Sequence, residues 1–368
     1  MNRGVTVILL GLAGVASSAA FSPAALSAPS AIRHAASLSC DRQSSSWGKV
    51  LGKKLGLFRG ATPLSATSST AESTDTSKAL KEGIANFYDQ SSPLWEEVWG
   101  EHMHMGHYGD LGDEKKSDEQ AQKDMIDRLL DFGEVALPTG AKVLDVGCGV
   151  GGSSRHIARR YPGCTTTGVT LSPVQSAHAV ERSAAAGLGD VTSFQVADAL
   201  NLPFEDNSFD LVWTLESGEH MPGKKEWLAE CYRVLKPGGR FLMATWVHKE
   251  TDSLTCGHAA NPDLTKKEKK LLSRISKYYH LPEWVTLGDY KAIAKDMGFL
   301  QSKDTDWTAT VAPFWPAVWR TALSWKGFKG LIKNGFETIR GARAVLFMIR
   351  GFNKGIVKLG LLTCTKPN

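Results

Sequence analysis

The sequence predicts one large α/β domain in which a mostly parallel sheet carries helices on both faces. An apolar run at residues 143–146 leads into a cluster of glycines and then into a helical pattern, which is the order strand, tight loop, helix. Further apolar runs of strand length alternate with helical patterns along the chain. A chain of 368 residues is long enough for one such domain with attachments and too short for three ordinary domains.

Residues 1–78 have the composition of a targeting segment. Residues 1–20 begin with Arg3, continue through "VTVILLGLAGVA" and end in small residues, which is the layout of a signal peptide. Residues 21–78 are rich in Ser, Ala, Thr and basic residues, as transit peptides are. Together with the junction "AAFSP", they resemble the bipartite presequence of secondary plastids. We therefore expect a plastid protein, peripheral on the envelope or thylakoid membrane; the alternative is an ordinary secretory signal followed by a linker.

The distribution of charge and of cysteine limits the class of partner. The formal net charge of +5 lies entirely in residues 1–78, so the rest of the chain is balanced and a nucleic-acid partner is not expected. From Trp307 to the end, however, Glu337 is the only acidic residue among many basic ones, which favours a surface for anionic lipid or an anionic ligand. The six cysteines form no CxxC pair, which indicates a reducing compartment.

The first strand and its glycine loop predict a nucleotide-type cofactor. In "AKVLDVGCGVGG", glycines permit positive φ and close approach of the backbone to a ligand, and we expect Gly147, Gly149 and Gly151 to contact the cofactor. The pattern G-x-G-x-x-G also occurs in dinucleotide-binding dehydrogenases. Two features oppose that alternative: Asp145 ends the strand just before the glycines, and the next strand ends in Thr170, where a dehydrogenase places an acid for the ribose diol.

The remaining strands complete a pattern that points to one enzyme class. A strand ends at Asp198, another covers residues 210–214, and a helix then leads to a turn at residues 236–239 and a fifth strand. Two more strands are expected near residues 299–307 and 355–365. In order, these segments resemble a class I S-adenosylmethionine-dependent methyltransferase, which implies a Rossmann-like, seven-stranded, mostly parallel sheet and S-adenosyl-L-methionine as the cofactor. We place an N-terminal lid at 79–118, the cofactor-binding core at 119–247 and a C-terminal substrate-cap region at 248–368.

Each predicted cofactor contact has a chemical reason. Asp145 is expected near the amino-acid end of the cofactor, and Asp198 with Ala199 at the adenine, where a carboxylate accepts from the amino group. Thr170, Leu171 and Gln175 would serve the ribose edge in place of an acid, and their "TLSxxQ" pattern resembles cyclopropane-fatty-acid and sterol methyltransferases. The alternative for Gln175 is a solvated helix residue.

Segments outside the core resemble a narrower family. "GIANFYDQSSPLWEEVWGEHMHMGHY", "LESGEHMP" and the tail "DWTATVAPFWPAVWRTALSWKGFKGLIKNGFETIRGA" look like the γ-tocopherol methyltransferase family. The resemblance implies methyl transfer to an aromatic carbon ortho to the chromanol hydroxyl, turning γ- into α-tocopherol and δ- into β-tocopherol. Two alternatives stay open: a methyltransferase for another prenylated quinol, a sterol or an alkaloid amine, and a non-catalytic membrane-bound binding protein.

Attack by the ring carbon is easier from a phenolate than from a phenol of pKa about 10, so a positioned base is expected. The segment "TLESGEHMP" follows the fourth strand, whose carboxyl end faces the cofactor. We expect His220 as the base and Glu219 as the residue that orients it or contacts the cofactor. Glu216 is expected at the cofactor.

The stretch "WGEHMHMGHYGD" places His102, His104 and His107 close together. They suggest a metal site, but transfer from a sulfonium needs no metal, and none is expected. The resemblance instead implies a lid over the cofactor, with Tyr88 and Trp99 touching it and His104 competing with His220 as the base.

An insertion of aromatic and basic residues separates the last two predicted strands. It holds Phe314, Trp315, Trp319, Trp325 and Phe328 among Arg320, Lys326, Lys329, Lys333, Arg340 and Arg343. Such a segment can cap a phytyl-tailed substrate while resting on a bilayer. The alternative is that the aromatic residues form ordinary core and the basic residues an ordinary solvated surface. No part of it is long and apolar enough to span a membrane.

Overall fold

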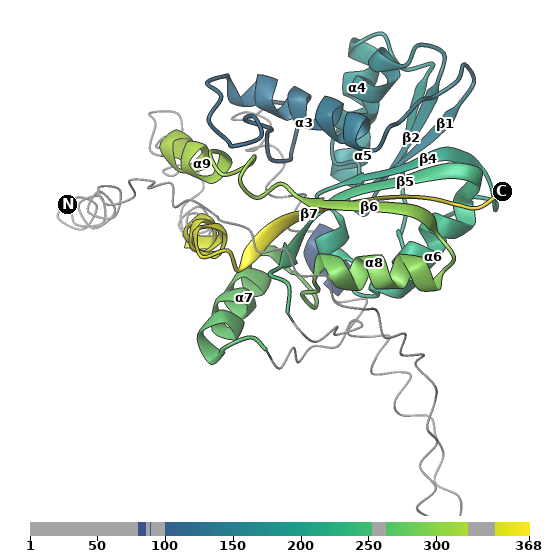
Figure 1. Ribbon diagram of the computed structural model, residues 1–368. Helices are drawn as coiled ribbons and strands as arrows, with labels where there is room; N and C mark the ends of the chain where they lie inside the picture. Colours follow the sequence, from purple (N-terminus) through teal and green to yellow (C-terminus); the bar gives the residue numbers. More distant parts are fainter. Residues whose placement is uncertain (1–79, 86–88, 90–99, 252–262, 323–342) are drawn as a thin grey trace, which may run out of the picture. The chain divides into compact units, whose positions relative to one another are not determined.

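A computed structural model describes residues 80–85, 89, 100–251, 263–322 and 343–368 (Figure 1). The predicted targeting segment, residues 1–78, lies outside this part of the chain, as do Tyr88 and Trp99. In the insertion, Trp325, Phe328, Lys326, Lys329, Lys333 and Arg340 also lie outside it.

The described part of the chain contains one seven-stranded sheet with the strand order β3-β2-β1-β4-β5-β7-β6. The strands are β1 (Lys142–Val146), β2 (Thr165–Thr170), β3 (Thr192–Val196), β4 (Phe209–Leu215), β5 (Leu235–His248), β6 (Leu300–Asp306) and β7 (Val357–Thr365). Strands β1 to β5 pair in parallel, whereas β7 runs antiparallel to both β5 and β6. The predicted seven-stranded, mostly parallel sheet is therefore confirmed.

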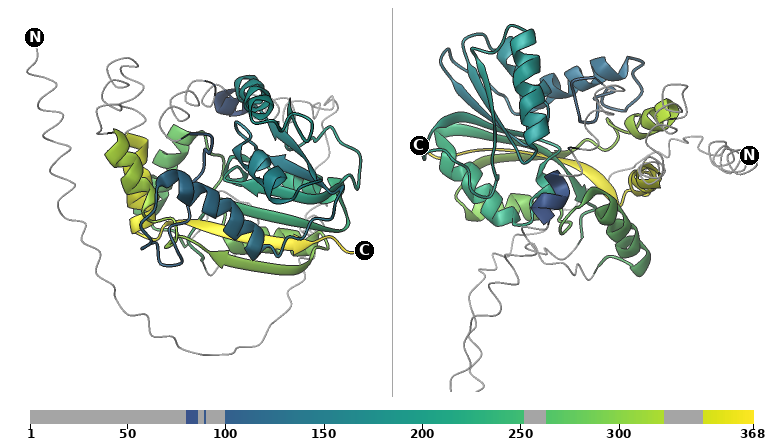
Figure 2. Two further views of the ribbon diagram at one scale, coloured as in Figure 1. Left: turned by 90° about the horizontal axis from the view of Figure 1, so that it is seen from above. Right: turned by 180° about the vertical axis from the view of Figure 1, so that it is seen from behind.

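Helices pack on both faces of this sheet, as Figures 1 and 2 show. They are α3 (Asp118–Phe132), α4 (Gly152–Arg160), α5 (Pro173–Ala185), the short η1 (Gly218–His220), α6 (Lys224–Val234), α7 (Lys266–Tyr279), α8 (Leu287–Asp296) and α9 (Phe314–Ala322). Residues 343–353 are also helical. None of the helices in the described ranges is long and apolar enough to cross a bilayer.

Two hydrophobic cores lie on opposite faces of the sheet because successive side chains of a strand point in opposite directions. On β1, Val143 packs with α3 and α4, whereas the next residue, Leu144, packs with α6 and α8. The first core continues into α7, α9 and the 343–353 helix, so these elements belong to the same packed unit as α3.

Two predicted strand ends differ in detail from the structure. Strand β3 ends at Val196, so Asp198 lies two residues beyond it rather than on it. The predicted turn at residues 236–239 lies inside β5, because Phe209 pairs with Leu235 and Leu211 already pairs with Arg240. The turn is thus a bulge in a strand that begins earlier, and Gly238 supplies its positive φ.

The strand order reverses direction between β1 and β4, because the chain winds outward from β1 to β3 on one side and from β4 to β5 on the other. Ligands of open α/β sheets bind beyond the carboxyl ends of the strands at such a point. The fold therefore directs attention to the loops after β1, β2, β3 and β4.

Candidate active site

A cavity opens beyond the carboxyl ends of β1 to β4, and the space within it together with the open solvent at its mouth is about 1050 Å³. Its walls come from the N-terminal segment, the glycine loop and the segments that follow β2, β3 and β4. The lining residues include Lys81, Glu101, His102, Met103, His104, Asp145, Gly147, Gly149, Thr170, Leu171, Gln175, Asp198, Ala199, Glu216 and His220.

The glycine loop forms one wall of the cavity. Gly147 has a φ of 80°, and a Cβ at this position would collide with the side chain of Ser217. Around Gly149, the one atom near an added Cβ would be the Met103 sulfur at 3.7 Å, so this glycine faces open space. Gly151, which was expected to contact the cofactor, is not among the lining residues; its φ of 77° instead starts α4. Gly152 takes its place in the wall.

Asp145 stands next to this loop with its side chain buried. Its Oδ2 accepts a hydrogen bond of 2.6 Å from the Ser154 hydroxyl, which fixes the carboxyl group at the cavity wall. Burial raises the pKa of Asp145 to about 7. A cationic ligand would reverse this shift because an opposite charge favours the ionised carboxylate.

The loops after β2 and β3 form a second wall. The Thr170 hydroxyl donates to Gln175 Oε1 at 2.8 Å, and Gln175 is only 3% exposed, so it is not a solvated helix residue. Asp198 accepts from the Leu200 N–H at 3.0 Å and forms an ion pair of 2.5 Å with Lys81. Lys81 could not be selected from the sequence, because 117 residues separate it from Asp198.

Glu216 follows β4 directly and has a φ of 53°, which is uncommon for a residue other than glycine. Its Oε1 accepts from the Met105 N–H at 2.7 Å and its Oε2 from the Trp246 indole N–H at 3.1 Å. Burial, reinforced by nearby Glu219, raises the pKa of Glu216 to about 8. A side chain held this firmly, on strained backbone and beside a cavity, is typical of a functional residue.

Glu219 does not lie where the sequence prediction placed it. It is absent from the cavity wall, and its Oε2 accepts from the Thr245 hydroxyl at 2.6 Å behind the turn. Lys224 donates to the carbonyl oxygens of Gly218 and Glu219 at 2.7 and 3.0 Å. The expectation that Glu219 contacts the cofactor is therefore corrected: this buried group supports the turn that carries His220.

Both candidate histidines line the cavity. Burial, with the nearby Lys224 and His280, lowers the pKa of His220 to about 3. Burial lowers the pKa of His104 to about 4. The Nδ1 of His104 lies 2.9 Å from the Met105 carbonyl oxygen, so it carries the proton and leaves Nε2 as an acceptor. Each imidazole is thus neutral at pH 7.

The three clustered histidines diverge in space. The rings of His102 and His104 meet edge to face at 5.4 Å, whereas the ring of His107 packs against Trp307 at 5.1 Å. Among the residues the structure places, no group of three His, Cys, Asp or Glu could hold a metal ion.

Aromatic residues extend from Glu216 into the first hydrophobic core. The Trp246 ring contacts Tyr279 of α7 at 5.4 Å and Trp315 of α9 at 6.0 Å. Phe314 and Trp315, two of the predicted cap residues, are buried in this core, whereas Trp319 is half-buried and Arg320 and Arg343 lie outside the core. In the described part, the aromatic residues of the insertion therefore pack into the first hydrophobic core.

Comparisons with known proteins agree with this geometry. A family model described as a methyltransferase domain matches residues 144–243. The chain is 45% identical to "Tocopherol O-methyltransferase, chloroplastic" of Arabidopsis thaliana, over 82% of this chain and 86% of that protein. It is 33% identical to the 2-methyl-6-phytyl-1,4-hydroquinone methyltransferase of Synechocystis over 78% and 88%, and 33% identical to the norajmaline N-methyltransferase of Rauvolfia serpentina over 78% and 98%.

Solved structures share the fold. The [4+2]-cyclase SpnF superposes with a TM-score of 0.62 at 24% identity, covering 78% of this chain and 97% of that one. Geranyl diphosphate C-methyltransferase from Streptomyces coelicolor, solved with S-adenosyl-L-homocysteine, superposes at 0.60 with 21% identity, covering 78% and 97%. At these identities the likeness establishes the fold alone, and the cyclase illustrates that one fold hosts different reactions.

Proposed function

Because this chain belongs to the tocopherol O-methyltransferase family, we propose that it methylates the chromanol ring of tocopherols, converting γ- into α-tocopherol and δ- into β-tocopherol. The observation that carries the proposal is the 45% identity over 82% of the chain, which extends well beyond the shared methyltransferase domain at residues 144–243. The plastid location proposed from residues 1–78 is supported by the chloroplastic names of the plant relatives.

The cavity fits S-adenosyl-L-methionine, which supplies an electrophilic methyl group when bound. Asp145 is placed to pair with its ammonium group, and the open face of Gly149 admits its amino-acid end. Thr170 and Gln175 offer hydroxyl and amide groups for the ribose, and Asp198 offers a carboxylate for the adenine amino group. These donors and acceptors match the polar groups of the cofactor from one end of the cavity to the other.

The acceptor chemistry requires removal of two protons. Loss of the hydroxyl proton makes the ring electron-rich, and the ortho carbon forms the new C–C bond as the methyl leaves sulfur. The hydrogen of that carbon then departs as a proton and the ring oxygen takes up a proton again, so that one proton is released in all. The first step needs a base whose pKa approaches that of the phenol, about 10. Of the cavity residues that follow β4 or lie in the histidine-rich stretch, Glu216, with a pKa of about 8, comes closer to this value than His104 or His220.

We therefore assign the base to Glu216 in place of His220. The N–H groups of Met105 and Trp246 hold its carboxylate at the junction between the cofactor cavity and the aromatic residues. His104 bonds the carbonyl of the same residue, Met105, and so fixes the backbone that positions Glu216. His220, which lines the same cavity, can accept a hydrogen bond from the acceptor without taking its proton.

A second acceptor class has specific support. The relative named norajmaline N-methyltransferase is 33% identical and nearly fully covered, so the scaffold also occurs in a protein named for an amine acceptor. An amine acceptor in its neutral form has a nitrogen lone pair available for attack. It would therefore make much weaker demands on Glu216 than a phenol does.

The test is an acceptor panel with the full-length chain and S-adenosylmethionine labelled at its methyl group. Labelled α-tocopherol should form from γ-tocopherol faster than product forms from 2-methyl-6-phytyl-hydroquinone or norajmaline. A variant with Asp145→Ala serves as the control for cofactor dependence. Methylation of norajmaline without methylation of γ-tocopherol would replace this proposal by the amine hypothesis.

A further inference from the structure

The outward face of α7 is strongly basic. The helix carries six basic residues and one acidic residue, Glu268, which is bonded to Lys249. All six are exposed, and at 100° per residue five of them fall on one stripe opposite the buried Leu271, Ile275 and Tyr279. The six are Lys266, Lys267, Lys269, Lys270, Arg274 and Lys277.

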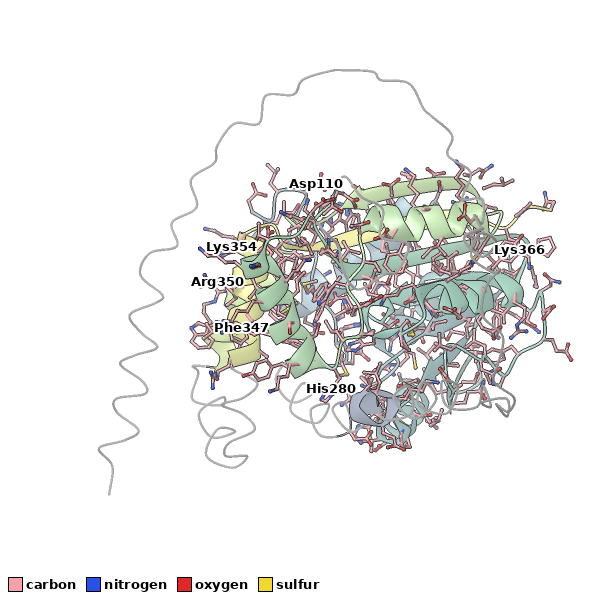
Figure 3. All side chains as sticks on the ribbon, turned by 90° about the horizontal axis from the view of Figure 1, so that it is seen from below. Asp110, His280, Phe347, Arg350, Lys354 and Lys366 are labelled. Carbon is pink, nitrogen blue, oxygen red and sulfur yellow. The ribbon has the colours of Figure 1, made fainter. Side chains whose placement is uncertain are left out.

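The 343–353 helix continues this face. Arg343 and Arg350 are exposed on the same side of the helix as Phe347, and Lys354 follows at its end. Figure 3 shows Phe347, Arg350 and Lys354 along one side of the molecule. The two helices meet at Phe347, whose ring lies 5.8 Å from Tyr278 and 5.5 Å from the Arg274 guanidinium.

We propose that this face, made of the six basic residues of α7 with Arg343, Phe347, Arg350 and Lys354, is the surface through which the protein docks on an anionic lipid bilayer. Clustered Lys and Arg side chains are attracted to anionic headgroups. Half-buried aromatic residues among them, here Tyr278 and Phe347, suit the boundary between headgroups and acyl chains. Because the two helices pack against each other at Phe347, their basic residues are gathered on one face.

The same helix connects the surface to the proposed active site. The inner side of α7 carries Tyr279, which contacts Trp246 at 5.4 Å, and Trp246 bonds Glu216 at 3.1 Å. The inner side of α7 thus packs against the residue that holds Glu216, so a bilayer bound on the outer side of α7 would lie one helix away from the proposed base. This part of the inference rests on the proposed function, whereas the docking surface itself rests on the charges and contacts of the two helices.

The test compares two charge-neutralised forms of the full-length protein in sedimentation with vesicles. In the first, Lys266, Lys267, Lys269 and Lys270 are replaced by Gln, which keeps helix propensity. In the matched control, four exposed lysines elsewhere, Lys115, Lys142, Lys225 and Lys295, are replaced in the same way. Equal melting temperatures and equal affinity for S-adenosylhomocysteine establish that both forms are folded.

Binding to phosphatidylcholine vesicles with 30% phosphatidylglycerol should weaken at least tenfold in the first form and less than twofold in the control. Equal weakening in both forms would overturn the proposal, because net charge rather than this face would then determine binding. Wild-type protein that ignores the vesicles but is retained on duplex DNA through the α7 lysines would overturn it in favour of a nucleic-acid surface.

A second measurement separates docking from catalysis. The α7 form should methylate γ-tocopherol in neutral detergent micelles as fast as wild type and lose at least fivefold when the substrate is embedded in the anionic vesicles. Equal loss in micelles would contradict the role of the face in substrate delivery. Absence of any methylation by wild type would refute the proposed function, while the sedimentation result would still decide the docking surface.

Discussion

The two halves of the cavity are built in different ways. The predicted cofactor contacts lie at the ends of β1, β2 and β3 or within a few residues of them, and the N-terminal segment adds Lys81 beside Asp198. The acceptor half joins distant parts of the chain, because Glu216 is held by Met105 and Trp246. The predicted cofactor contacts thus follow from local backbone geometry, whereas the position of the proposed base depends on tertiary packing.

The largest expected effect falls on the acceptor half. Replacing Glu216 by Gln should lower kcat about 1000-fold, because an amide cannot accept the phenolic proton. Affinity for S-adenosylhomocysteine should change less than threefold, since the cofactor half is intact. Single-turnover rates with γ-tocopherol and calorimetric binding of S-adenosylhomocysteine measure the two quantities separately.

The same substitution has a signature in stability. The pKa of Glu216 rises from 4.5 to about 8 on folding, so the folded protein keeps a proton that the unfolded chain loses. Wild type therefore loses stability as pH rises through this range. Between pH 5 and 8, the unfolding free energy of wild type should fall relative to that of the Gln variant by on the order of 3 kcal/mol. A variant that is both inactive and increasingly less stable than wild type at pH 8 would indicate a structural role instead.

The next largest effect is expected in the cofactor half, where a substitution should change the affinity for S-adenosylmethionine rather than kcat. Replacing Asp145 by Asn should weaken S-adenosylmethionine binding about 50-fold, because a buried ammonium would lose its partner. In wild type, affinity should fall as pH drops below the Asp145 pKa of about 7, where the carboxyl becomes neutral. Calorimetric titrations from pH 5.5 to 8 measure this dependence. An Asn variant with the same pH slope as wild type would assign the titration to another group.

The residues predicted to bind the cofactor could be selected from the sequence because their signals are local. Each lies in or just after a strand that could be recognised by its own apolar run, and the structure places all of the following at the cavity: Asp145, Gly147, Gly149, Thr170, Gln175 and Asp198. Gly151 was the exception in the loop, because sequence spacing cannot tell a glycine that faces a ligand from one that starts a helix.

The acceptor half was predicted less well for a physical reason. The order of Glu216, Glu219 and His220 in one motif does not determine which side chain faces the cavity. The positive φ of Glu216 turns the chain so that Glu216 and His220 line the cavity, while Glu219 points to Thr245. Burial then changes the chemistry, lowering the pKa of the histidines and raising that of the carboxyl group. Neither effect can be read from residue types.

Replacement of the two histidines by Phe should affect kcat differently, by about a factor of ten. Replacing His104 by Phe should lower kcat about tenfold, because it removes the hydrogen bond to the Met105 carbonyl that helps hold Glu216. Replacing His220 by Phe should raise KM for γ-tocopherol about threefold with little change in kcat. Steady-state kinetics at saturating cofactor measure both. A 1000-fold loss of kcat in the His220 variant would return the role of base to that residue.

The smallest expected effect tests where the halves meet. Lys81 comes from the N-terminal segment yet occupies Asp198 Oδ2, the oxygen that an adenine amino group would approach. The side chains of Lys81 and Asp198 are each 30% exposed, and ion pairs this exposed to solvent contribute at most about 1 kcal/mol of interaction free energy. Replacing Lys81 by Met should therefore tighten S-adenosylhomocysteine binding only about threefold, and should flatten its dependence on salt, because salt no longer releases the carboxylate. Weaker binding in the variant would show instead that Lys81 assists the cofactor, so that the N-terminal segment belongs functionally to the cofactor half.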